Sequence, residues 1–289
     1  MDDWGMQEEI AALARITDPW LQVRKAHDLV GQLAEYSTEA SRIRREALEV
    51  LLSDPQIKPG KIANHLGISR QRVTQLANSG PKPERAFLGK GTNLTMVVGG
   101  KSEGDKSQPG PVVSTDDLGG YRLLSDAGRD LGFTVEYEVL QPPGFVDLSR
   151  DNLLVCCGPR LSPLIEQSLR ADNAIRFEHD DDGWFLHDRV RDQIYRSPMD
   201  SGVSVDYGYL ARLPRVDGAG TYLYSAGIHA PGVTGGLHYM LSDLADIYRN
   251  VRLNRFSCIV RCEFDPETRR VLDSERVTDL YRPEQGATQ

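Results

Sequence analysis

Cysteine is scarce in this chain of 289 residues, and its four cysteines form no CxxC pair. Cys156 and Cys157 are adjacent, and Cys258 and Cys262 are four positions apart, all within runs that have the pattern of strands. These spacings do not match a zinc knuckle, and two thiols in one buried strand rarely meet as a disulfide. We therefore expect reduced core thiols and no metal site.

Long apolar runs are also missing. No run approaches the ~18–20 residues that cross a bilayer, and the acidic start, MDDWGMQEEIAAL, lacks the basic and apolar segments of a secretory signal. We expect a protein without membrane contact that stays in the cytoplasm. The length exceeds the ~100–200 residues of a usual domain, so two domains are expected.

The charges are unevenly distributed along the chain. The net charge of −8 argues against a protein that coats nucleic acid nonspecifically. Residues 40–90 nevertheless hold ten Lys/Arg and four Asp/Glu, a balance of +6, whereas residues 91–289 hold 21 and 30, a balance of −9. A basic patch on an acidic chain is typical of a protein that contacts phosphate through one part only.

Helical periodicity dominates the first 80 residues. Apolar positions recur at helical spacing in 6–16 and 20–33, Pro19 stands at a first-turn position, and a third helix is expected to start after Ser37 or Thr38. Prolines and glycines then crowd residues 78–93. We predict an all-α domain at 1–80 and a linker at 81–92.

Strand patterns alternate with helical ones after residue 93. Short apolar runs at 93–100, 133–140 and 152–159 alternate with helical segments near 116–131 and 163–169, and further strands follow residue 174, with a helix at about 234–249. This alternation is typical of a parallel sheet covered on both faces, which the later strands would join in antiparallel fashion. The predicted fold class is α/β with a separate all-α domain. The second domain, at 93–283, is expected to be Rossmann-like, with a mixed sheet in three layers, and a disordered tail is expected at 284–289.

The stretch KIANHLGISRQRVTQLANSG, residues 61–80, has the pattern of a helix-turn-helix, predicted at 59–78. Ala63 is a small residue where two helices would cross, Gly67 can take a left-handed turn conformation, and Ser69 stands at an N-cap. The apolar positions that would hold the helices together are Ile62, Leu66, Ile68, Val73 and Leu76.

The polar face of the second helix carries side chains that suit base edges in a DNA major groove. Arg pairs with guanine, Gln and Asn pair with adenine, and a Thr methyl group can contact thymine. We therefore expect double-stranded DNA as a partner. The candidate DNA-binding residues are Ser69, Arg70, Gln71, Arg72, Thr74, Gln75 and Asn78, with Lys61, Arg42 and Arg45 as phosphate contacts. Alternatively, Arg42 and Arg45 belong to a helix face that only contacts solvent. The helix-turn-helix pattern could likewise form a pair of helices used for protein contacts.

Residues 61–76, KIANHLGISRQRVTQL, resemble the helix-turn-helix of bacterial transcription regulators and the sigma-factor segment that reads the −35 promoter element. The helices at 6–53 are more loosely similar to the lead-in of actinobacterial regulators, and 93–283 resembles uncharacterised α/β domains fused to such motifs. No segment resembles the sigma-factor parts that bind the −10 element or core polymerase. The resemblance implies a sequence-specific transcription regulator. Because one helix-turn-helix makes few contacts, we expect a homodimer, formed through 6–36 or through the α/β domain.

Glycine-rich turns are predicted after three apolar runs of the α/β domain. Ligands of open parallel sheets bind at the carboxyl ends of strands, where backbone N–H groups and a helix N-terminus can receive an anion. The candidate ligand-binding residues are Gly99, Gly100, Gly158, Pro159, Arg160, His229, Gly232, Thr234 and Gly235. The expected effector is a small, nucleotide-like anion. The GxGxxG and GK[ST] motifs are missing, so no cofactor is predicted, and tight turns are the alternative.

An enzyme acting on a nucleotide or glycoside is the alternative from another class. His229 could act as an acid or base with His238, Asp206 or Cys157, but no spacing ties these residues together, so no catalytic residue is assigned. The acidic run EHDDDGW, 178–184, lies between two strand patterns and is expected to form a solvated hairpin turn rather than a metal site.

Overall fold

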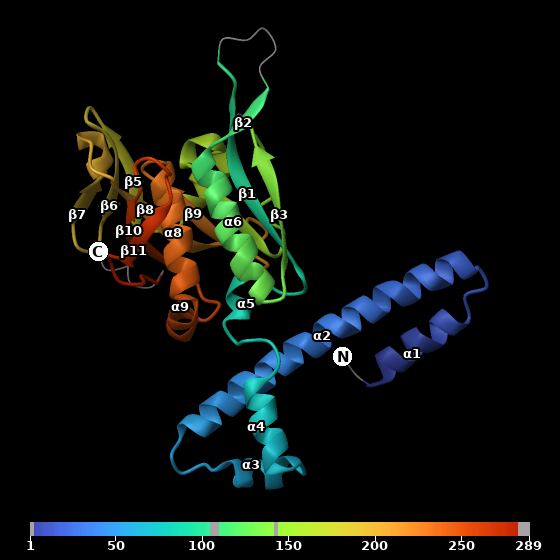
Figure 1. The fold of residues 1–289 in the computed structure, drawn as a ribbon. Helices are drawn as coiled ribbons and strands as arrows, with labels where there is room; N and C mark the ends of the chain where they lie inside the picture. The colour runs from blue at the N-terminus through green and yellow to red at the C-terminus, as the bar shows by residue number, and fades with distance from the viewer. Residues whose placement is uncertain (1–2, 105–109, 142–143, 283–289) are drawn as a thin grey trace. The chain divides into compact units, whose positions relative to one another are not determined.

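The chain divides into two compact units, Met1–Pro83 and Glu84–Gln289. The computed structural model describes residues 3–104, 110–141 and 144–282. The first unit is helical, and the second contains a mixed sheet with helices, which confirms the coarse α/β class with a separate helical region (Figure 1). None of the helices in the described residues combines the length and the apolar character that a membrane span requires. The predicted tail at 284–289 lies outside the described residues.

The longest element of the first unit is α2, Pro19–Ser53, a single helix of 35 residues. It begins after an N-cap, Asp18, whose carboxylate accepts a hydrogen bond from the Trp20 N–H at 3.0 Å. The predicted break near residue 38 is wrong. The Thr38 hydroxyl donates to the Ala34 carbonyl at 2.8 Å within the helix, so it caps no new one.

Three helices accompany α2 in the described part of the first unit. α1, Asp3–Ala14, lies beside the first half of α2, and the other two follow α2 closely (Figure 1). These are α3, Pro59–Leu66, and α4, Arg70–Asn78. Their shared core with the end of α2 consists of Leu48, Ile62, Ala63, Val73, Leu76 and Ala77.

The turn between α3 and α4 has the features that the sequence predicts. Gly67 adopts the left-handed conformation, with φ of 65°. The Ser69 hydroxyl accepts a hydrogen bond from the Arg72 N–H at 3.1 Å and so caps α4. The two helices and their turn therefore agree with the pattern at 59–78.

Part of the predicted linker at 81–92 is folded. Residues Arg85–Leu88 form one turn of helix, α5, and all four are buried. The Phe87 ring lies 5.8 Å from that of Phe256, in the core of the second unit. Apolar residues at 86–88 thus draw this part of the chain into the second unit, whose boundary lies after Pro83.

The second unit is centred on a mixed sheet, which has eight strands in the described residues. The strand order is β11-β10-β8-β9-β4-β1-β2, and β3 also pairs with β1. β9, β4, β1 and β3 run parallel, whereas β2, β8, β10 and β11 pair in antiparallel fashion. The strands are β1 Asn93–Ser102, β2 Pro111–Val113, β3 Thr134–Leu140, β4 Leu153–Cys156, β8 Val205–Pro214, β9 Thr221–Gly227, β10 Phe256–Phe264 and β11 Val271–Arg276.

The strands between residues 175 and 196 do not join this sheet, contrary to prediction. They form a smaller antiparallel sheet, β5-β6-β7, with bounds Ile175–Asp180, Gly183–Asp188 and Gln193–Arg196. The acidic run at 178–184 makes the predicted hairpin turn between β5 and β6, in which Gly183 has φ of 110°. Asp180 at this turn forms an ion pair with Arg196.

Two layers cover the main sheet. Its cores lie under α6 and α8 on one face (Figure 1), and under α7 and the smaller sheet on the other. Val98, Cys156 and Leu210 belong to the first core, and their chain neighbours Val97, Val155 and Tyr209 belong to the second. The remaining helices are α6 Thr115–Asp130, α7 Pro163–Leu169, α8 Ala230–Ser242 and α9 Leu244–Val251, with 3₁₀ turns η1 Pro159–Leu161 and η2 Pro198–Ser201.

Candidate functional sites

The helix α4 uses its apolar face in the core and exposes its polar face. Val73, Leu76 and Ala77 are buried, and Val73 has no exposed surface. The exposed positions include every residue that the sequence predicts to contact DNA on this helix: Ser69, Arg70, Gln71, Arg72, Thr74, Gln75 and Asn78. The core thus fixes the rotation of the helix and leaves its hydrogen-bonding side chains on the surface.

A hydrogen bond organises this surface. Arg72 Nη1 donates to Gln75 Oε1 at 2.6 Å, one turn further along α4. A guanidinium reads guanine with two parallel hydrogen bonds, which requires a defined plane. Gln75 is therefore placed to orient the Arg72 guanidinium.

The surface around α4 is basic. Residues 55–83 hold five Lys/Arg and no Asp/Glu. A groove of about 750 Å³ lies between the start of α3 and α4, lined by Lys58, Lys61, Asn64, Arg70, Gln71 and Thr74. A Cβ on Gly60 would come within 2.8 Å of Arg70 Nε, so the glycine lets this side chain lie across the start of α3. Cations and amides around one groove suit phosphate contacts beside base contacts.

Two predicted phosphate contacts, Arg42 and Arg45, are used inside the first unit instead. Arg42 is 6% exposed and forms ion pairs with Glu39 at 2.7 Å and Glu46 at 2.9 Å. Arg45 forms an ion pair with Glu49 at 2.8 Å and donates to a backbone carbonyl after α4. Both arginines are therefore engaged by carboxylates at helical spacing within the first unit, which favours a structural role over the predicted phosphate contact.

A cavity of about 420 Å³ opens in the second unit where β1, β4 and β9 end. The starts of α6 and α8 border the same cavity. Its lining includes Gly99, Gly100, Lys101, Ser114, Asp117, Cys156, Cys157, Gly158, Gly227 and His229. We call it the carboxyl-edge cavity. Parallel strand ends and helix N-termini meet here, as they do where α/β sheets bind ligands.

The carboxyl-edge cavity unites some of the predicted ligand-binding residues and separates others. Gly99, Gly100, Gly158 and His229 line it. Gly99 and Gly100 do not form a turn, because β1 continues to Ser102 and Gly100 pairs with Val113 of β2. Pro159 lines a different cavity, and the side chain of Arg160 lies outside the described part of the structure.

The predicted residues Gly232, Thr234 and Gly235 lie inside α8 rather than in a loop before it. A Cβ on Gly232 would come within 2.6 Å of Asp206 Oδ2, and one on Gly235 within 2.6 Å of Cys262 Sγ. These glycines therefore allow α8 to pack closely on the sheet. Their assignment to an anion is corrected to helix packing.

Asp206 occupies the N-terminus of α8. Its Oδ2 accepts hydrogen bonds from the backbone N–H groups of His229 at 3.0 Å and Gly232 at 2.8 Å. Burial raises the pKa of the Asp206 carboxyl, and the hydrogen bonds that it accepts oppose the shift. A side chain of the protein thus takes the place at this helix end where an anionic ligand was expected.

The start of α6 contributes a polar pair that sequence reasoning missed. The Ser114 hydroxyl accepts a hydrogen bond from the Asp117 N–H at 3.0 Å and donates to Asp117 Oδ2 at 2.6 Å. Burial raises the pKa of Asp117, although the Ser114 hydrogen bond and the charge of Lys101 oppose this shift. The Ser-x-x-Asp spacing before an apolar helical pattern is the signal that could have found the pair.

The two cysteines that line the carboxyl-edge cavity, Cys156 and Cys157, are poorly suited to act as nucleophiles. Burial raises the pKa of Cys157 to about 12, and it raises that of Cys156 well above its ordinary value. Such thiols stay protonated and unreactive. The His229 ring pairs through Nε2 with Asp200 Oδ1 at 2.7 Å, and its backbone N–H, rather than the ring, contacts Asp206.

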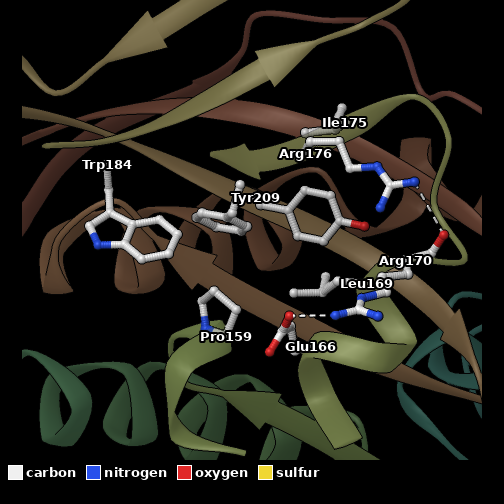
Figure 2. Close-up of a pocket in the computed structure, with 9 residues that line it drawn as sticks. Pro159, Glu166, Leu169, Arg170, Ile175, Arg176, Trp184 and Tyr209 are labelled. Carbon is white, nitrogen blue, oxygen red and sulfur yellow. Dashed lines mark hydrogen bonds and ion pairs between the residues drawn. The ribbon is translucent and has the colours of Figure 1, made fainter. Parts of the chain in front are cut away.

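A second cavity, of about 350 Å³, lies between α7, β5, β6 and β8. Figure 2 shows Trp184 and Pro159 toward one side of it and Arg170 and Arg176 toward the other. Its size and aromatic walls suit a flat ring. Its polar groups are engaged by the protein, however, since Arg170 pairs with Glu166 at 2.8 Å and the Tyr209 hydroxyl donates to a carboxylate at 2.7 Å.

No family model, no curated protein and no solved structure matches this chain.

Proposed function

We propose that this protein is a sequence-specific DNA-binding transcription regulator that reads the major groove with α4. The observation that carries the proposal is the division of this helix into two faces. The side of Val73 is sealed in the core, while the opposite side exposes arginine, glutamine, threonine and asparagine within a segment free of acidic residues, 55–83. This combination suits base edges and a phosphate backbone together.

In this proposal the contacts divide by chemistry. Arg70 and Arg72 approach base edges, and Gln75 holds the Arg72 guanidinium in plane. Lys58 and Lys61, which line the groove beside α4, contact phosphates and set the position of the protein on the duplex. Because a lone helix-turn-helix gives few contacts, we propose that two copies bind two half-sites.

We propose that the second unit is a Rossmann-like sensor that binds a small anionic, nucleotide-like effector in the carboxyl-edge cavity. The volume of about 420 Å³ falls within the range of small-molecule sites. Lys101 supplies the positive charge that an anion needs, in place of the α8 N-terminus that Asp206 already occupies. Bound effector would alter the affinity of the paired recognition helices for DNA.

The first test is the genome-wide recovery of DNA fragments bound by the full-length protein. Arg70→Ala/Arg72→Ala is compared with Gln167→Ala, which changes an exposed side chain of α7 in the second unit. We expect the wild type and Gln167→Ala to enrich one inverted-repeat motif that the double variant loses. Enrichment that is scattered, or that survives the double substitution, would refute the assignment of α4.

The effector is tested by thermal shift of the full-length chain with a panel of nucleoside mono- and diphosphates. Lys101→Ala should abolish a stabilisation caused by binding in the carboxyl-edge cavity, whereas Trp184→Leu should leave it unchanged. The reverse result would move the ligand to the aromatic cavity. A panel without effect on wild type would contradict the proposed effector class.

A further inference from the structure

The hairpin of α1 and α2 exposes most of its large apolar side chains. Residues 6–47 are all described, and among their apolar residues Leu29 alone is buried. The exposed ones include Trp20 at 81%, Val30 at 65%, Tyr36 at 55% and Ile43 at 53%. Helices of this kind gain most of their stability from packing an apolar face, so this surface requires a partner.

The exposed apolar residues of the second half of α2 form a continuous row. Tyr36, Ala40, Ile43, Ala47 and Val50 follow one another at spacings of four, three, four and three residues, and all are exposed. The same alternation extends back through Leu33, Leu29 and Ala26. An alternation of three and four is the repeat of a coiled coil. We call residues 36–50 in this row the apolar seam.

The rest of the first unit leaves the apolar seam open. Leu48 and Leu52 point from α2 into the helix-turn-helix core, where Leu48 is 3% exposed. Val50, between them, is 59% exposed. One side of the helix is therefore committed to α3 and α4, and the seam lies on another.

We propose that the apolar seam pairs with the seam of a second copy of this chain as a parallel, two-stranded coiled coil. The inference deepens the proposed function and rests on it, since it identifies the surface that brings two recognition helices together. α2 continues from the seam to its last turns, where Leu48 and Leu52 pack in the helix-turn-helix core. Parallel pairing therefore places both copies of α4 at the same end of the coiled coil.

Charges beside the seam favour the parallel arrangement. Glu39 and Arg44 flank it on opposite sides and are five residues apart, which is the spacing at which flanking residues of two parallel helices meet. Glu46 continues the flank of Glu39. An antiparallel pair would set this acidic flank against its own copy, and like charges would repel. Glu39 already pairs with Arg42, but a carboxylate can accept hydrogen bonds from a second cation.

The mass of the full-length protein in solution, measured over a range of concentrations without DNA, tests the interface. We expect a dimer, and we expect Ile43→Asp to raise its dissociation constant at least about 30-fold, because it puts a charge in the centre of the seam on both copies. The matched control is Ala34→Asp, an exposed position on the opposite side of α2. A monomer at all concentrations, or a dimer that tolerates Ile43→Asp, would overturn the proposal.

Cysteine cross-linking tests the direction of the pairing. The native cysteines are all buried, so an introduced one supplies the exposed thiol. Val50→Cys should form a disulfide-linked dimer on mild oxidation, whereas Ala34→Cys should not. Efficient linking of Tyr36→Cys chains to Val50→Cys chains in a mixture would instead show antiparallel pairing and overturn the parallel model.

DNA binding is measured separately, so the two proposals can fail independently. Arg70→Ala/Arg72→Ala should lose DNA and keep the dimer, and Ile43→Asp should lose the dimer and bind an isolated half-site. A wild-type dimer that depends on Ile43 but binds no DNA would support the seam and refute the regulator. A monomer that binds DNA specifically would do the opposite.

Discussion

The Asp206 carboxylate lies 2.8 Å from the backbone nitrogen of Gly232 and accepts its hydrogen bond in the first turn of α8. The same oxygen would lie within 2.6 Å of a Cβ on residue 232. Because Gly232 has no side chain, the N-terminus of α8 can approach β8 closely. The Asp206 carboxylate on β8 then accepts hydrogen bonds from the N–H groups at that helix end.

Alanine at position 232 should destabilise the second unit. We expect Gly232→Ala to lower the free energy of unfolding by ~1–3 kcal/mol or more, because the new methyl group forces α8 away from β8. Gly119→Ala is the matched control: it also lies within a helix, α6, but a Cβ there meets no atom within 4 Å. That variant should be more stable than wild type by ~0.5–1 kcal/mol. Urea denaturation measures both, and equal stability of Gly232→Ala and wild type would show that the close approach is not needed.

Burial of Asp117 should make stability depend on pH. Because the pKa of Asp117 is raised in the folded state above its ordinary value of 3.8, the folded chain holds more protons than the unfolded chain in the interval between the two values. The contribution of this group to the free energy of unfolding then falls as pH rises through that interval. Asp117→Asn removes the ionisation, so its stability relative to wild type should be greater at pH 7 than at pH 3.

Denaturation at the two pH values checks this prediction. Asp126→Asn, at an exposed position on the same helix, serves as the control. A stability difference between Asp117→Asn and wild type that does not change with pH would contradict the assigned burial effect.

The hydrogen bond between Arg72 and Gln75 predicts linked effects on base preference. Arg72→Ala should cost ~1–3 kcal/mol of binding free energy at the preferred site and relax the preference at one base position. Gln75→Ala should weaken the preference at that same position, because it releases the guanidinium from its plane. Binding titrations on operators changed one base at a time measure both. Effects confined to different base positions would show that the two residues read DNA independently.

Two cations that the sequence predicts to contact phosphate, Lys61 and Arg45, should behave differently. Lys61→Ala should weaken binding to all sequences alike and reduce the slope of log affinity against log salt by about one, since our proposal assigns a phosphate contact to this side chain. Arg45→Ala should lower the stability of the first unit, because it breaks the ion pair with Glu49, and it should leave the salt slope unchanged. A loss of salt slope in Arg45→Ala would restore its assignment to DNA.

The helix-turn-helix could be predicted from the sequence because its signals are local. A left-handed position at Gly67 and a cap at Ser69 depend on a few neighbouring residues. Even here Leu66, expected in the small core, is 47% exposed, because spacing alone does not decide which apolar residues beside a turn are covered. The pairing of Arg42 with Glu39 and Glu46 was also available from helical spacing.

The candidate ligand site depends on contacts that the sequence does not show. A run of glycines shows that the backbone there carries no side chains. It does not show whether a ligand or another part of the protein approaches that backbone. Gly232 and Gly235 face Asp206 and Cys262, which come from β8 and β10. Only the sheet topology brings these strands under α8, so a packing role and a binding role look alike in the sequence.

The continuity of α2 places a limit on how the length of this protein can change. Each residue of an α-helix turns the chain by about 100° and advances it by about 1.5 Å. One residue inserted between Ile43 and Leu48 would rotate the helix-turn-helix by that angle about the axis of α2, relative to the first part of the apolar seam. Seven inserted residues would restore the direction to within about 20°. Insertions and deletions in this stretch should therefore be compatible with function chiefly in whole heptads.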